Sequence, residues 1–158
     1  MKNFFRKVAF GIGPNEQAPS DPLKWALDQV NDVPELSWKG KIYSEKELRK
    51  HYRDWVYGDR KVLRKKYKDN KTLYKTHKDI LRHKTGQKFW ESLEISIRHN
   101  EGINSSHPVL AKLWMFWGNF FAISEKDFLA NYSTGAYQRE IIRPNLNQSF
   151  EKMVYDVT

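Results

Sequence analysis

The segment from His107 to Pro144 limits the fold of this chain more strongly than any other part of the sequence. It holds two of the six Trp residues and four of the nine Phe residues. Its first half is an almost continuous apolar stretch with helical spacings of three and four, and its second half carries Arg139, Glu140 and Arg143. This pattern predicts a buried helix followed by a charged helix. The expected core side chains are Trp114, Trp117, Phe120 and Phe121, and Asn119 among them needs a buried hydrogen-bond partner.

The remaining sequence also has helical periodicity and lacks the alternating pattern of strands, so we predict an all-α fold, an irregular multi-helix bundle. A short helix is expected at 22–30 with Asp21 as its cap, because Pro22 suits the first helical position. Ser44 and Glu47 form a capping-box pattern. It opens a long helical segment to about residue 84, with an interruption expected at 57–59. Further helices are expected at 86–99, after the cap Ser106, from 124–127 onward, and at 137–143 before Pro144.

The predicted organisation is one helical domain over 1–158, or the amino-terminal fragment of a larger helical protein. Within it we distinguish a strongly basic helical segment at 41–88 and an aromatic-rich core segment at 106–158. The last nine residues, FEKMVYDVT, predict a helix without a stop signal, so a truncated chain is expected. The chain has no Cys, which excludes disulfides, thiol catalysis and Cys-bound metals. Neither a membrane-spanning run nor a secretory signal pattern is seen, and a cytoplasmic location is the default expectation.

Positive charge is concentrated in one stretch. Residues 39–88 hold 18 Lys or Arg and 6 Asp or Glu, a net charge of +12, whereas the remainder has a net charge of −3. On one continuous ideal helix, the interleaved tyrosines face the core and a row of cations faces the other way. Two hypotheses stay open: binding of nucleic acid or another polyanion, or a solvated face of a lysine-rich protein. The candidate anion-binding residues are Arg53, Arg60, Arg64, Lys71, Lys75, Lys78 and Arg82.

Sequence patterns for catalysis are weak. The five His residues are scattered without metal-ligand spacing, so no metal is predicted. The lone Gly11-Ile12-Gly13 before a proline does not suit a dinucleotide turn, and no cofactor is predicted. Arg139 and Arg143 are one helical turn apart and could clamp an anion. The alternative is an Arg–Glu network that ties their helix to its neighbours.

Four motifs together resemble the bacterial domain of unknown function 1800 family: AFGIGP at 9–14, LKWALDQ at 23–29, the Trp-rich 107–124 and AYQREIIRP at 136–144. In the first two, the family residues fall on Phe10, Gly11, Pro14, Trp25 and Gln29. In the last two, they fall on Phe116, Trp117, Asn119, Phe121, Tyr137, Arg139, Glu140, Ile142, Arg143 and Pro144.

The resemblance implies a helical protein without an assigned activity, of which this chain would cover the amino-terminal part. It also marks two departures, because Phe120 and Gly118 stand where the family has histidines. We therefore expect a structural or protein-interaction role rather than an enzyme, with a protein partner. The alternatives are an anion- or nucleic-acid-binding module through the basic face at 53–82, and part of a hydrolase whose catalytic groups lie in a missing carboxy-terminal region.

Overall fold

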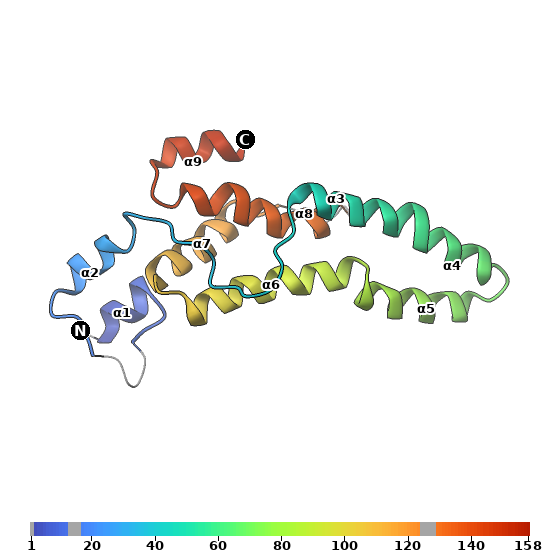
Figure 1. The fold of residues 1–158 in the computed structure, drawn as a ribbon, viewed down its shortest axis with the longest axis horizontal. Coiled ribbons are helices and arrows are strands. Elements are labelled where there is room, and N and C mark those ends of the chain that lie inside the picture. Colours follow the sequence, from blue (N-terminus) through green and yellow to red (C-terminus); the bar gives the residue numbers. More distant parts are fainter. Residues whose placement is uncertain (1, 13–16, 124–128) are drawn as a thin grey trace. The chain divides into compact units, whose positions relative to one another are not determined.

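The computed structural model describes residues 2–12, 17–123 and 129–158, and these residues form helices joined by loops, with no strand among them (Figure 1). The predicted all-α fold is therefore confirmed. The predicted helix start at 124–127 and Pro14 lie outside the described residues. The elements are α1 (Lys2–Val8), α2 (Pro22–Asp28), α3 (Glu45–Arg53), the π-helix η1 (Asp54–Asp59), α4 (Arg60–Lys66), α5 (Lys71–Lys84), α6 (Gln87–Asn104), α7 (Pro108–Phe120), α8 (Ala130–Tyr137), the π-helix η2 (Gln138–Ile142), the 3-10 helix η3 (Arg143–Asn145) and α9 (Phe150–Val157).

The chain divides into two compact units. Unit 1 comprises Met1–Gly40, Ser96–Ala122 and Gln138–Thr158, and unit 2 comprises Lys41–Ile95 and Ile123–Tyr137. The sequence of unit 2 holds 18 Lys or Arg and 10 Asp or Glu, whereas that of unit 1 holds 10 and 9. Almost all of the net positive charge therefore belongs to unit 2. In the described part of the chain, no helix combines the length and apolar character needed to cross a membrane.

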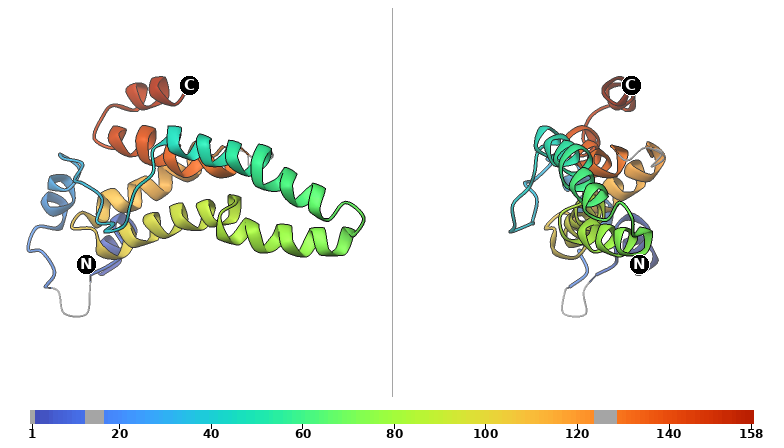
Figure 2. Two further views of the ribbon diagram at one scale, coloured as in Figure 1. Left: turned by 45° about the vertical axis from the view of Figure 1, so that its right-hand side comes forward. Right: turned by 90° about the vertical axis from the view of Figure 1, so that its right-hand side faces the viewer.

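Unit 2 is built on a long helical hairpin. The arm formed by α3, η1 and α4 runs antiparallel to the arm formed by α5 and the first part of α6 (Figures 1 and 2). The predicted capping box at the start of α3 is present, with Ser44 accepting a bond from the backbone N–H of Glu47 and Glu47 accepting one from Ser44. The buried core of the unit consists of Leu48, Trp55, Trp90, Tyr132 and Ala136.

The hairpin turn is a correction to the predicted continuous segment. The expected interruption at Tyr57-Gly58-Asp59 is instead π-helical, and the chain reverses between α4 and α5. Asn70 causes the reversal, because its side chain accepts a 3.0 Å bond from the backbone N–H of Leu73 and so begins a new helix. A helical projection of residues 53–82 as one rod is therefore invalid, since its two halves face each other across the turn.

Unit 1 is organised around α1, α2 and α7. Phe5 and Trp25 meet edge to face with ring centroids 5.3 Å apart, and Ala9, Ala26 and Val109 form a buried cluster beside them. Asp21 caps α2 as predicted, through a 3.0 Å bond from the backbone N–H of Lys24. The predicted cap of α7, Ser106, is not used. Instead the buried side chain of Gln29 accepts a 3.1 Å bond from the backbone N–H of Val109.

Two further predictions for unit 1 are wrong. The expected loop at 100–106 is helical as far as Asn104, because Glu101 is buried and hydrogen-bonded there. Phe120 is 62% exposed and Asn119 is exposed, although both were expected among the core residues. Helix α7 is apolar on more than one face. Leu110, Trp114 and Gly118, at four-residue spacing, line a buried face, whereas Phe116 and Phe120 lie on an exposed one.

Candidate functional site

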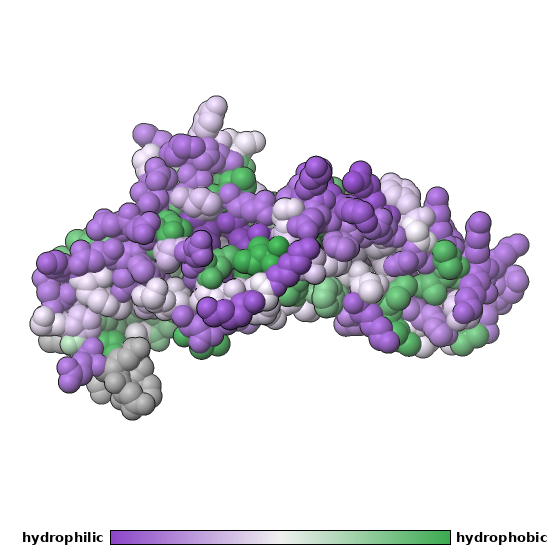
Figure 3. All heavy atoms as spheres, in the orientation of Figure 1, coloured by the Kyte–Doolittle hydropathy of each residue, from purple (hydrophilic) through white to green (hydrophobic). Residues whose placement is uncertain are grey.

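A cavity of about 580 Å³ lies at the turn of the unit 2 hairpin, and we call it the basic pocket. In Figure 3, hydrophilic side chains crowd the α4–α5 end of the hairpin, with hydrophobic side chains visible between them. The residues that line the pocket are Arg64, Tyr67, Lys68, Lys71, Tyr74, Lys75 and Lys78. Five of these seven residues are cationic and none is acidic.

The turn at Asn70 brings these side chains together. Arg64 comes from the last turn of α4, and Lys71 is the first residue of α5. Lys71, Tyr74, Lys75 and Lys78 follow the three- and four-residue spacing of one helical face. The helix dipole favours Arg64 at a carboxyl end but opposes Lys71 at an amino end, where an acidic residue would be stabilising. The first turn of α5 contains no acidic residue.

The five cations of the basic pocket have no carboxylate partner within the part of the chain that the structure describes. Cations at the other end of the hairpin behave differently. Lys41 lies 2.9 Å from Glu47 and Lys50 lies 2.7 Å from Asp54. Among the described residues, no direct ion pair therefore offsets the positive charge of the pocket.

Two tyrosines complete the pocket, although the sequence pattern placed them toward the core. Tyr67 stacks on His77 with ring centroids 4.6 Å apart and an angle of 7° between the rings. The ammonium of Lys66 lies 5.4 Å from the centroid of Tyr67. Tyr74 is half-buried and has no ring partner among the described residues. Both tyrosines are half-buried between exposed neighbours, which agrees with the inward direction that the pattern predicted.

The structure gathers only part of the predicted cationic row into this pocket. Arg64, Lys71, Lys75 and Lys78 line it, whereas Arg53, Arg60 and Arg82 do not. Arg53 ends α3 in an exposed position, Arg60 is half-buried at the start of α4, and Arg82 lies 3.6 Å from Asp79. Sequence analysis missed the remaining lining residues, Tyr67, Lys68 and Tyr74. The Asp69-Asn70 pair was the available signal, because these residue types favour turns and helix caps.

The family-motif arginines have separate partners in unit 1. Arg139 is buried and lies 3.1 Å from Glu140. Arg143 lies 3.5 Å from the carboxylate of Glu101 and donates a 2.5 Å bond to the carbonyl of Pro34. Burial lowers the pKa of Arg143 and the neighbouring Glu101 carboxylate opposes that shift.

Glu101 is the centre of a buried polar network. Its Oε2 accepts bonds of 2.9 Å from the backbone N–H of Ser37 and 2.8 Å from the hydroxyl of Ser37. The amide of Asn100 donates a 2.9 Å bond to the same hydroxyl. The network joins α6 to the loop before α3 and, through Arg143, to η3.

Of the two positions that depart from the family pattern, Gly118 packs against Gln138. Its Nε2 donates a 3.0 Å bond to the carbonyl of Gly118, and its backbone carbonyl accepts a 2.8 Å bond from the indole of Trp114. A Cβ atom at Gly118 would lie 3.1 Å from the amide carbon of Gln138. A histidine at this position would therefore displace Gln138, which also accepts a 2.5 Å bond from Arg98.

The other motif residues are less buried. Trp117 and Phe121 are half-buried, and both rings pack against Phe150 of α9, with centroids 5.5 and 6.5 Å away. Tyr137 ends α8, and burial raises the pKa of its phenol. Pro144 is exposed within η3.

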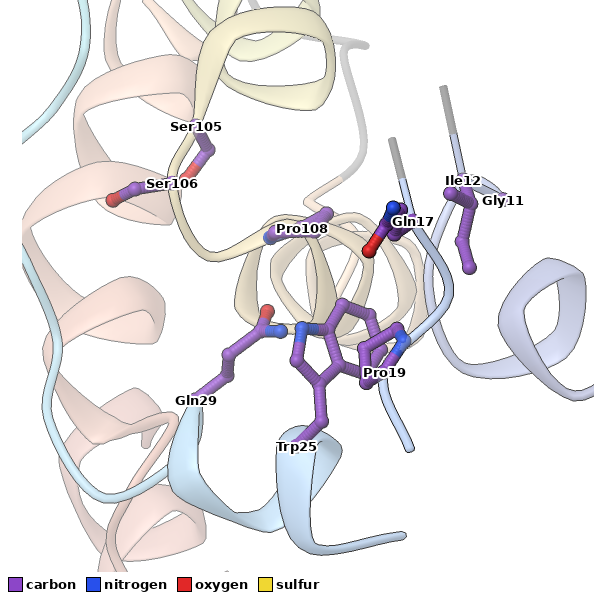
Figure 4. Close-up of a pocket in the computed structure, with 9 residues that line it drawn as sticks. All are labelled: Gly11, Ile12, Gln17, Pro19, Trp25, Gln29, Ser105, Ser106 and Pro108. Atoms are coloured by element: carbon purple, nitrogen blue, oxygen red, sulfur yellow. The ribbon is translucent and has the colours of Figure 1, made fainter. Parts of the chain in front are cut away.

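A second cavity, of about 400 Å³, lies at the start of α7 in unit 1. Figure 4 shows Trp25 and Gln29 extending from α2 toward Pro108. The carbonyl oxygen of the Gln29 side chain is already hydrogen-bonded to Val109, so this group contributes to helix capping. Among the described residues, no group of three His, Asp or Glu side chains is arranged to hold a metal ion.

Comparison with known proteins identifies one family. Residues 3–158 match the family described as protein of unknown function (DUF1800). Neither a curated protein nor a solved structure matches the chain. Because the family match covers essentially the whole length of the sequence, the chain belongs to the DUF1800 family.

Proposed function

We propose that this protein is a helical binding module that holds a polyanion in the basic pocket. The observation that carries the proposal is the convergence of Arg64, Lys68, Lys71, Lys75 and Lys78 on one cavity without an acidic residue in its lining. Phosphate or sulfate groups are the complementary ligands for such a site, because Lys and Arg bind them through charge-assisted hydrogen bonds.

The energetic cost of the arrangement supports a functional origin. Like charges at three- and four-residue spacing on a helix each cost a few tenths of a kcal/mol, about 0.2–0.5 per pair. The hairpin adds a cation from α4 to those of α5, and it places Lys71 at the unfavourable end of a helix dipole. Natural proteins keep such local conflicts mainly at functional sites.

The test compares two doubly substituted proteins of equal net charge by salt elution from heparin. Lys71→Gln/Lys75→Gln removes two charges from the basic pocket, and the control Lys61→Gln/Lys65→Gln removes two exposed charges of α4 outside it. Each lost phosphate or sulfate contact should lower the slope of log affinity against log salt by about 0.7–0.9. We expect the pocket variant to elute at clearly lower salt than the control.

Two results would contradict the proposal. Equal elution of both variants would mean that only net charge matters. Elution of the unmodified protein below about 0.2 M salt would mean that it has no useful affinity for polyanions.

A second candidate function, contact with a protein partner, is favoured by a different surface. The rings of Phe116, Trp117, Phe120, Phe121 and Phe150 form one cluster in unit 1, the aromatic cluster. Phe116, Phe120 and Phe150 are 56%, 62% and 53% exposed. Contiguous exposed apolar side chains are typical of interaction sites. The role as part of a hydrolase stays a prediction.

A photo-crosslinking amino acid tests this second candidate. Placed at Phe120, it should give a discrete cross-linked protein species in the source cells, whereas the same group at Ile103, which is 81% exposed outside the cluster, should not. Equal, diffuse labelling from both positions would count against a protein partner at the aromatic cluster.

A further inference from the structure

We propose that the ligand of the basic pocket is single-stranded nucleic acid, with a base stacked on Tyr74 and the surrounding cations bound to its phosphates. This inference rests on the proposed function, and it adds the chemical class of the ligand. Sequence-tolerant proteins that bind single strands combine a positively charged surface with aromatic side chains on which bases stack.

The dimensions of the pocket favour a single strand. Its volume of about 580 Å³ lies within the range of ligand pockets, roughly 300–1,000 Å³, and one unstacked nucleotide fits such a cavity. A double helix keeps its bases paired and inside, so only its outer phosphates could approach the rim. The cavity itself would then hold no part of the ligand.

Along α5 an aromatic ring lies between cationic side chains, just as each base of a nucleotide chain lies between phosphates. Lys71, Tyr74, Lys75 and Lys78 lie on one helical face, so the tyrosine has cations on both sides within about one turn, ~5.4 Å. A base on the ring would therefore have its neighbouring phosphates beside ammonium groups.

Tyr74 is the better stacking platform of the two tyrosines. The ring of Tyr67 is already stacked on His77 and has the ammonium of Lys66 nearby. Tyr74 has no ring partner within the described residues. The stack on His77 fixes the orientation of the Tyr67 side of the pocket, and Tyr74 is left to receive a ligand ring.

An anionic membrane surface fits the pocket less well. Lipid binding by a helix depends on apolar side chains that enter the interface beside the cations. The exposed apolar residues of α4 and the first half of α5, Val62 and Leu73, are absent from the pocket lining. The lining contains aromatic rings and no aliphatic residue.

The experiment measures the affinity of the unmodified protein for five probes: a short oligothymidylate, an abasic oligomer of the same length, a DNA duplex, heparin, and phosphatidylserine vesicles. The abasic oligomer has the same phosphates without bases. We expect the oligothymidylate to bind more tightly than the abasic oligomer, because base–aromatic stacking contributes about 1–3 kcal/mol per base, a factor of roughly 5–150.

Variants assign this preference to Tyr74. Tyr74→Leu should remove the advantage of the oligothymidylate over the abasic oligomer, and it should lower the affinity for oligothymidylate more than the affinity for heparin. Tyr74→Phe, which keeps a ring, should retain the advantage. Tyr57→Leu is the matched control, since Tyr57 is 62% exposed outside the pocket, and it should behave as the unmodified protein does.

The outcomes separate this inference from the proposed function. Binding of heparin with equal affinity for the two oligomers would overturn the nucleic-acid assignment and leave polyanion binding intact. Preference for the vesicles over both oligomers would replace it with a lipid surface. Absence of binding to all five probes would overturn both proposals. Equal losses for heparin and oligothymidylate in Tyr74→Leu would show that Tyr74 only supports the fold of the pocket.

Discussion

Lys71 is the residue at which the stability and the proposed function of the hairpin conflict. It occupies the first position of α5, where exposed backbone N–H groups give the helix end a positive partial charge. It also lines the basic pocket with Lys68 and Lys75. Replacing it with an acid should therefore help the helix and harm the pocket.

We predict that Lys71→Glu raises the free energy of unfolding by about 0.3–1 kcal/mol, because the carboxylate is favoured at the amino end of α5 and lies four residues before Lys75. Urea denaturation measures this change, and heparin elution should shift to lower salt in the same protein. The control is Lys84→Glu, which makes the same charge change at the other end of α5, where it should destabilise. Equal stability changes in the two variants would refute the argument from the helix dipole.

The sequence alone identified most of the cations of the basic pocket but neither of its tyrosines. A lysine or arginine can be recognised in a sequence whatever the fold is, so Arg64, Lys71, Lys75 and Lys78 were predicted as candidate anion-binding residues. The direction of a tyrosine depends on where the helix ends. Tyr67 and Tyr74 were expected to face inward and are half-buried, but the pocket that they line was missed because the turn between them was taken as continuous helix.

Helix ends are the elements whose behaviour follows most directly from sequence. The capping box of α3 was predicted and is present. The side chain of Glu47 accepts bonds from Lys41 and from the backbone N–H and hydroxyl of Ser44, and these hold the pKa of Glu47 down to about 2. Because the folded-state pKa lies below that of the unfolded chain, the ionised group stabilises the fold above the unfolded pKa.

We therefore predict that stability falls as the pH is lowered from about 5 to about 2, and that Glu47→Gln reduces this dependence. Urea denaturation across that pH range measures the slope. A residual slope is expected because hydrogen bonds donated by Lys50 and Lys152 also lower the pKa of Asp54 and of Asp156. An unchanged slope in Glu47→Gln would mean that the capping box does not form in solution.

The contact between α6 and α8 gives a second prediction for the elements. Gly135 lies on α8, and a Cβ atom there would collide with the Cβ of Glu94. Gly58 in η1 has open space around the same position. Replacing a helical Gly with Ala ordinarily stabilises by about 0.5–1 kcal/mol.

We predict opposite signs for the two substitutions. Gly58→Ala should stabilise by about 0.5–1 kcal/mol, whereas Gly135→Ala should destabilise by about 1–3 kcal/mol because the helices must separate. Thermal and urea unfolding measure both. If Gly135→Ala were as stabilising as Gly58→Ala, the close packing of α8 on α6 would be incorrect.

Across the whole molecule, buried polar contacts join segments that are far apart in the sequence, and no local sequence pattern predicts these contacts. Glu101 on α6 meets Ser37 in a loop and Arg143 in η3, with side chains of Glu101 and Arg143 only 3% and 13% exposed. From the sequence, Arg143 was expected either to clamp an anion or to belong to an Arg–Glu network, but Glu101 could not be identified as its partner. Tertiary packing decides which sequence-distant residues become partners. In addition, residues 100–106 were expected to be a loop, so Glu101 was not considered as a buried helical residue.

We predict that Arg143→Ala destabilises by about 3–5 kcal/mol, because it leaves the Glu101 carboxylate buried without its cation. Glu101→Ala should cost a similar amount. The double substitution should cost clearly less than the two single losses added together, and urea denaturation of all four proteins measures the coupling. Strict additivity would show that the two groups do not interact in solution.

The π-helix η1 has a consequence for the opposite end of its own arm. A π-helical stretch commonly accommodates one inserted residue within an otherwise α-helical rod. If the same residues were wound as a regular α-helix, every later residue of α4 would be rotated about the rod axis by up to about 100°, the rotation of one residue. Arg64 would then point away from α5, although its own sequence neighbourhood had not changed. The direction in which Arg64 points, and with it the meeting of Arg64 with the lysines of α5, thus depends on the wide turn of η1 earlier in the same arm.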